Sequence, residues 1–178
     1  MKLRRPARRA TLVLHIAFSV SWLGLSLGLL ALAVTAATSG STEAMEASYR
    51  SMKVFTDWLI LPVALITLGT GLLLSLGTPW GLAQHRWVYT KFWLTLVTTA
   101  ASVFALRPSV DNAAAQAVAG VPVEGAAGLV VPPLVSLSAY AFMTALSVLK
   151  PWGLTRRGRK VRSSGRKPLD AEGLRQTA

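Results

Sequence analysis

Four long apolar stretches, separated by shorter polar segments, dominate the chain. They cover about residues 11–37, 54–76, 87–106 and 128–149. About twenty residues in a helix, at a rise of about 1.5 Å each, cross a hydrocarbon core of about 30 Å. The pattern therefore predicts an all-α fold, a polytopic integral membrane four-helix bundle. Residues 11–150 form its membrane domain.

The first apolar stretch has a competing interpretation as a secretory signal peptide. Basic residues precede it, and it contains the small-residue sequence Ala31-Leu32-Ala33. It is far longer than the roughly 7–15 apolar residues of a signal peptide, and further spans follow it. We therefore interpret it as a helix of the mature protein.

Charge is concentrated at the two ends of the chain. Only 15% of the residues are charged and 52% are hydrophobic, whereas roughly 25% are charged in a typical soluble domain. Of the 19 Lys and Arg residues, 14 lie before residue 10 or after residue 149. The positive-inside rule places both basic tails, residues 1–10 and 151–178, in the cytoplasm. The second tail is poor in apolar residues, which predicts disorder.

An even number of spans returns the chain to its starting side, so the prediction is an N-in/C-in, multi-pass protein of a bacterial inner membrane. Residues 39–53 and 107–127 then form outer loops, and residues 77–86 form the inner loop. Sixteen Lys and Arg residues lie on the inner side, against three on the outer side. That asymmetry supports the orientation. The three outer residues are Arg50, Lys53 and Arg107.

The net charge of +12 would suggest a nucleic-acid partner in a soluble protein. Membrane topology accounts for the charge here, so no nucleic acid is expected. The expected partners are the lipid bilayer and, at the basic tails, anionic lipid at roughly 1 kcal/mol per Lys or Arg near the surface. A homo-oligomer or a membrane-protein partner stays open.

Two ionisable residues lie inside the apolar stretches at similar depth near the cytoplasmic side. His15 is about four residues into the first stretch, and Lys91 is about four residues into the third. Ionisable groups at membrane depth are costly and point to function. A neutral imidazole binds metal or haem iron, so His15 and Lys91 are candidate cofactor-binding residues and His15 is the candidate metal ligand. The alternatives are a hydrogen bond from His15 to a neighbouring helix and snorkelling of Lys91.

Trp22 follows His15 by two helical turns on the same face, so it is a candidate wall of that site or a packing residue. Asp57 lies near the outer end of the second span, and we predict that it pairs with Arg107, with Lys53 as an alternative. The spacing of Gly24 and Gly28 predicts close helix packing, within the bundle or with another membrane protein.

Several chemistries are absent from the sequence. There is no cysteine, which excludes thiolate metal sites and cysteine nucleophiles from the chain. No phosphate loop, paired His-Glu zinc motif or nucleophile elbow is present. These absences argue against an ATP-driven or hydrolytic enzyme.

Three segments together resemble a known superfamily. They are His15-x6-Trp22-Leu-Gly24, the run from Pro62 to Gly71, and Trp87-x3-Lys91. Over about residues 11–106 the chain resembles uncharacterised bacterial four-helix predicted integral membrane proteins, which are domains of unknown function. It resembles more distantly the HemJ-type protoporphyrinogen oxidases and the copper-resistance D membrane domain.

The oxidase resemblance implies that His15 and Lys91 serve haem binding. In that family an Arg follows the Trp-containing motif and a His follows the third-span Lys, and this sequence has neither, which favours a role other than catalysis. We therefore expect a membrane protein of unassigned biochemical role with a candidate haem or metal site near the cytoplasmic leaflet. The alternatives are a haem-dependent porphyrin oxidase and a metal-handling or carrier subunit.

Overall fold

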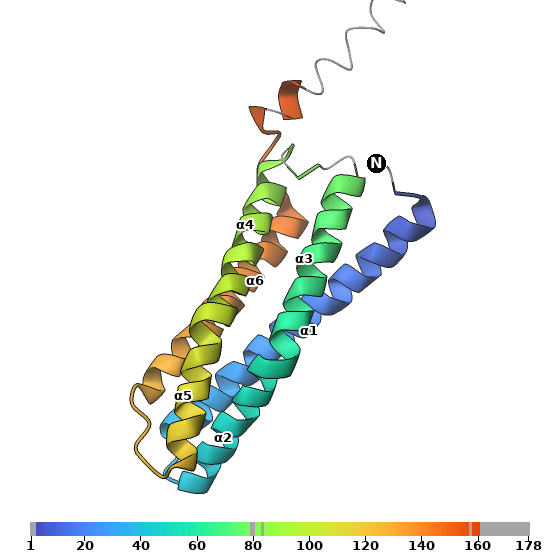
Figure 1. Cartoon of the computed structure of the whole chain (residues 1–178). Helices are drawn as coiled ribbons and strands as arrows, with labels where there is room; N and C mark the ends of the chain where they lie inside the picture. Colours follow the sequence, from blue (N-terminus) through green and yellow to red (C-terminus); the bar gives the residue numbers. More distant parts are fainter. Residues whose placement is uncertain (1–2, 79–80, 83, 157, 161–178) are drawn as a thin grey trace, which may run out of the picture.

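The computed structural model describes residues 3–78, 81–82, 84–156 and 158–160. These residues form four long helical rods, two of which contain a π-helical turn (Figure 1). In chain order the elements are α1 (Arg5–Thr38), α2 (Thr42–Val54), the π-helical η1 (Phe55–Leu59), α3 (Ile60–Gly77), α4 (Arg86–Ala101), the π-helical η2 (Ser102–Leu106), α5 (Arg107–Val118), the 3₁₀-helical η3 (Ala126–Val130) and α6 (Val131–Leu149).

The four rods form an antiparallel bundle (Figure 1). The first rod packs against the second through α2 and α3, and against the fourth through η3 and α6. The third rod packs against the second through α3 and α2, and against the fourth through α6. The helices α1 and α4 therefore occupy opposite corners. The predicted all-α fold is confirmed.

Three of the four rods are long and apolar enough to cross a membrane. They are Arg5–Thr38, Thr42–Gly77 and Ala126–Leu149. The third rod, Arg86–Val118, is more polar because α4 and η2 carry Lys91, Thr95, Thr98 and Ser102. Their spacing places these four residues on one helix face. Thr98 and Ser102 are buried, so this polar face is turned toward the bundle interior.

Both predicted outer loops are largely helical. Ser41 caps α2, because its Oγ accepts a hydrogen bond from the Ala44 N–H at 3.3 Å. After the third apolar stretch, the helix continues through the Ala-rich α5. Hydropathy marks only the part of a helix that lies in an apolar medium, whereas α2 and α5 are stabilised by packing against each other. Tyr49 and Val110 are completely buried in that contact region.

Tight packing is concentrated in the half of the bundle that holds α2 and α5. The larger core cluster contains Leu29, Tyr49, Met52, Leu106 and Val110 among its buried residues. A smaller cluster, centred on Trp22, lies nearer the end at which α1 and α4 begin. In α1, all of which the structure describes, no residue before Trp22 is fully buried. Figure 1 shows the blue N-terminal end of α1 diverging from α4 and α6.

The start of the C-terminal tail, predicted to be disordered, contacts the turn between α3 and α4. His85 and Leu154 form an antiparallel bridge, and the Thr155 N–H donates to the Gln84 carbonyl at 2.8 Å. The rest of the predicted disordered tail, residues 161–178, lies outside the described residues.

Candidate functional site

His15 bridges α1 and α3. Its Nδ1 lies 3.2 Å from the Thr67 carbonyl oxygen and 3.1 Å from Thr70 Oγ1. A carbonyl oxygen only accepts, so the bond to Thr67 requires that Nδ1 carry the proton. The Thr70 hydroxyl donates to the Ile66 carbonyl at 2.7 Å, which leaves its oxygen free to accept from the same Nδ1–H. In the neutral imidazole, Nε2 then holds the lone pair that a metal needs.

Gly71 provides the space for the imidazole. A Cβ added at Gly71 would lie 3.1 Å from His15 Cε1, closer than ordinary van der Waals contact. The absent side chain therefore allows α1 and α3 to approach with the ring between them. Gly71, Thr67 and Thr70 lie in one of the three segments that carry the family resemblance. The sequence alone predicted no role for any of them.

We expect Gly71→Ala to move the His15 ring, because the new methyl group would press on Cε1. Gly69→Ala is the matched control, since a Cβ at Gly69 meets nothing within 4 Å in the same helix. The measurement is the imidazole ¹⁵N spectrum of the purified protein, with His15 assigned by its loss in His15→Ala. Equal spectra for the two glycine variants would contradict the assigned contact.

Lys91, in α4, is held by a contact with α6. Its Nζ donates to Ser147 Oγ at 2.6 Å, and the Ser147 hydroxyl donates to the Met143 carbonyl at 2.8 Å. His15 and Lys91 are thus fixed by α3 and α6 respectively rather than by each other. Both residues lie in the half of the bundle in which α1 and α4 begin.

Trp22 lies in the bundle interior and is only 2% exposed. Its ring centroid is 4.9 Å from that of Tyr140, with the planes tilted by 48°. Ala64 and Met143 complete the same buried cluster. These contacts are those of a packing residue, which was one of its two predicted roles.

A polar layer surrounds this aromatic pair. The Tyr140 hydroxyl is buried and completes no hydrogen bond to any described residue, although the side chains of Ser26, Thr98 and Ser136 lie near it. The Thr98 hydroxyl donates instead to the Leu94 carbonyl at 2.8 Å, one turn back in its own helix. The periodic polar face of the third rod was a sequence signal for this layer.

Charged side chains form a second cluster where α2 and α5 adjoin the two π-helical turns. Asp57 accepts from Arg107 Nε at 3.0 Å and from Lys53 Nζ at 2.9 Å. Lys53 also pairs with Asp111. Asp57 therefore contacts both of the cations that the sequence proposed for it. The cluster links the second rod to the third at the level of the two π-helical turns.

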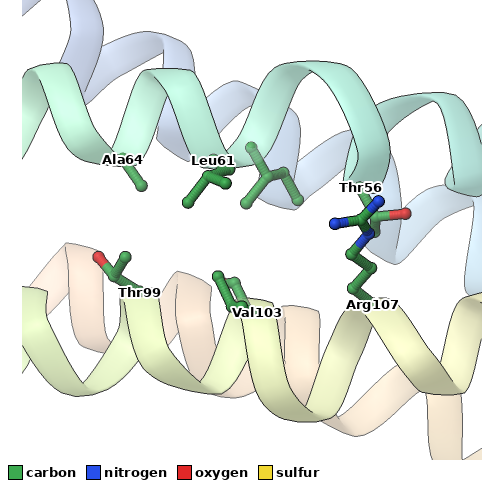
Figure 2. Close-up of a pocket in the computed structure, with 8 residues that line it drawn as sticks. Thr56, Leu61, Ala64, Thr99, Val103 and Arg107 are labelled. Carbon is green, nitrogen blue, oxygen red and sulfur yellow. The ribbon is translucent and has the colours of Figure 1, made fainter.

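A small cavity lies beside this cluster, between the second and third rods. It has a volume of about 10 Å³, which is room for about one water molecule. Figure 2 shows side chains from the two rods facing each other across it; those labelled are Thr56, Leu61, Ala64, Thr99, Val103 and Arg107. A π-helical turn inserts one extra residue and widens a helix locally, often at a functional site.

The two glycines predicted to pack helices lie in different surroundings. A Cβ at Gly28 would lie 3.0 Å from Phe55 Cε2, so this position accommodates the Phe55 ring. Gly24 is exposed and has nothing within 4 Å of its added Cβ. Of these two glycines, Gly28 alone supports a close approach within the described bundle.

No group of three or more His, Cys, Asp or Glu side chains in the described part of the chain is placed to hold a metal ion. Compared with known proteins, the chain matches no family model, no curated protein and no solved structure. The family resemblance therefore rests on the three quoted segments alone and stays a prediction.

Proposed function

We propose that this chain is a four-span protein of a bacterial inner membrane with both termini in the cytoplasm. The position of the third rod supports a fourth span, because it packs beside both the second and the fourth rods. Its outward side chains include Trp93, Val97 and Phe104, which suit lipid. Its hydroxyl groups at Thr98 and Ser102 are buried, where they meet protein instead of lipid.

The distribution of charge supports the orientation. Every Asp and Glu among the described residues lies in the half of the bundle that holds α2 and α5. These are Glu43, Glu46, Asp57, Asp111 and Glu124. The opposite end carries basic residues from the N-terminal segment, the α3–α4 turn and the start of the C-terminal tail. The positive-inside rule assigns that basic end to the cytoplasm.

We propose further that the protein binds haem through His15. The observation that carries this proposal is the Nδ1 hydrogen bond to the Thr67 carbonyl, which fixes the tautomer and leaves Nε2 to face a metal. Haem iron needs only one or two axial protein ligands, whereas a protein cage for a bare ion such as zinc needs three or four. A single histidine nitrogen with a lone pair therefore fits haem better than it fits a bare ion.

Lys91 suits the same ligand. An ammonium group has three N–H donors, and Ser147 takes one of them. The remaining donors bind a carboxylate such as a haem propionate. The bound haem supplies an iron that changes redox state, and the chain's own residues orient it and balance its charge.

Haem titration of the purified protein tests this proposal. The wild type should give a Soret band at about one haem per chain, and His15→Ala should lose it. His85→Ala is the matched control, because His85 is the only other histidine. Lys91→Met should keep the band and weaken the affinity by about tenfold, the equivalent of about 1.4 kcal/mol. A wild type without a Soret band, or equal binding by both histidine variants, would refute the haem site.

A further inference from the structure

The C-terminal segment lines one side of an open pocket at the cytoplasmic end of the bundle. The bridge between His85 and Leu154, together with the Thr155 hydrogen bond to Gln84, brings Arg159 to the start of α4. The pocket is open and has a volume of about 470 Å³. Its lining residues are Arg86, Pro151, Trp152, Gly153, Leu154 and Arg159.

This pocket is positively charged without a counter-ion from the described chain. Arg86 and Arg159 contribute two guanidinium groups, one from each side of the segment contact. The described carboxylates all lie in the other half of the bundle. No described residue therefore neutralises this pair, and the two guanidinium groups suit an anionic ligand.

Apolar surface adjoins the pocket. Val148 and Leu149 end α6 just before the pocket-lining Pro151 and are 74% and 73% exposed. Trp152 lines the pocket itself, and Trp side chains favour the membrane–water interface. This arrangement matches the two parts of a phospholipid. The two arginines suit its charged headgroup, and the tryptophan and the exposed apolar helix end suit its acyl chains.

We propose that this pocket binds the phosphate group of an anionic phospholipid in the inner leaflet. Arginine forms paired hydrogen bonds to phosphate oxygens, which a diffuse basic tail does not provide. The acyl chains of the lipid then lie along Leu149 and Val148. The proposal rests on the inward orientation proposed above and is independent of haem.

Lipid binding by the purified full-length protein in detergent micelles tests the pocket. Phosphatidylglycerol, which is anionic, should bind at least about tenfold more tightly than zwitterionic phosphatidylcholine, the equivalent of about 1.4 kcal/mol. The double variant Arg86→Gln/Arg159→Gln should lose this preference. Arg156→Gln, an exposed arginine that does not line the pocket, should keep it. Circular dichroism checks that each variant stays helical.

Two further arms separate this site from its alternatives. Arg86→Lys/Arg159→Lys keeps the net charge and should still weaken phosphatidylglycerol binding several-fold, because lysine lacks the planar fork. Wild-type affinity in that variant would mean diffuse attraction to the tails and would overturn the pocket. Inorganic phosphate at the lipid concentration should not compete; full competition would assign a free-anion site instead of a lipid site. A detergent micelle has no inner and outer face, so a negative result in these lipid-binding experiments does not bear on the membrane orientation. Cysteine labelling in cells tests that orientation separately.

Discussion

Single cysteines at Gly40 and Val121 should react with a membrane-impermeant maleimide in intact cells from which the outer barrier has been removed. Cysteines at Ala7 and Gly153 should react only after the membrane is made permeable. The first pair lies at the end of the bundle that carries the described carboxylates, and the second pair lies at the basic end. All four positions are exposed, so the membrane governs the accessibility of the introduced thiols. The chain has no cysteine of its own, so each variant carries a single reactive thiol.

This labelling experiment is decisive because of the third rod. If Arg86–Val118 did not cross, residue 121 would stay inside and α6 would carry the chain outward. The cysteine at Gly153 would then react in intact cells and that at Val121 would not. Four spans and three spans therefore give opposite results at these two positions. The expected contrast is all or none, which no change in local packing reproduces.

The helical rods followed from hydropathy, but their full lengths did not. The sequence placed a helix near each of the four rods because apolar runs of about twenty residues have few other uses. From the sequence, the second helix was expected to begin, and the third to end, at the membrane surface. Packing of Tyr49 and Met52 in α2 against α5 extends them. The π-helical turns have no local sequence signature, since they depend on how two rods meet.

The contacts of His15 likewise depend on how the helical rods pack against one another. The spacing of charged residues indicated how deep each apolar-stretch residue lies in the membrane. It placed His15 and Lys91 at similar depth. Which helix each side chain faces depends on the rotation of α1 and α4 about their axes. Nothing in the sequence stated that Thr67 would meet His15 or that Ser147 would meet Lys91. The Asp57–Arg107 pair was easier to propose, because opposite charges at one membrane surface have few other partners.

Trp22→Ala should produce the largest loss of stability of any single tryptophan change in the described chain. The indole is 2% exposed and packs on Tyr140, Ala64 and Met143. Its removal leaves a cavity that neighbouring helices fill only partly, at a cost of about 3 kcal/mol. Dispersion attraction between well-packed side chains is a main source of helix association in a membrane, and such a cavity weakens it. The measurement is reversible unfolding in mixed micelles of increasing denaturing detergent.

Trp58→Ala is the matched control for this change. Trp58 is 74% exposed, so its removal leaves no internal cavity and should cost only about 0.5 kcal/mol. Trp22→Phe should fall between the two, because it keeps a ring against Tyr140. Haem titration of the same variants separates the two roles predicted for Trp22. A packing residue loses stability first and keeps the His15 ligand, whereas a site wall would lose haem affinity at unchanged stability. Equal stability of Trp22→Ala and Trp58→Ala would contradict the packing role.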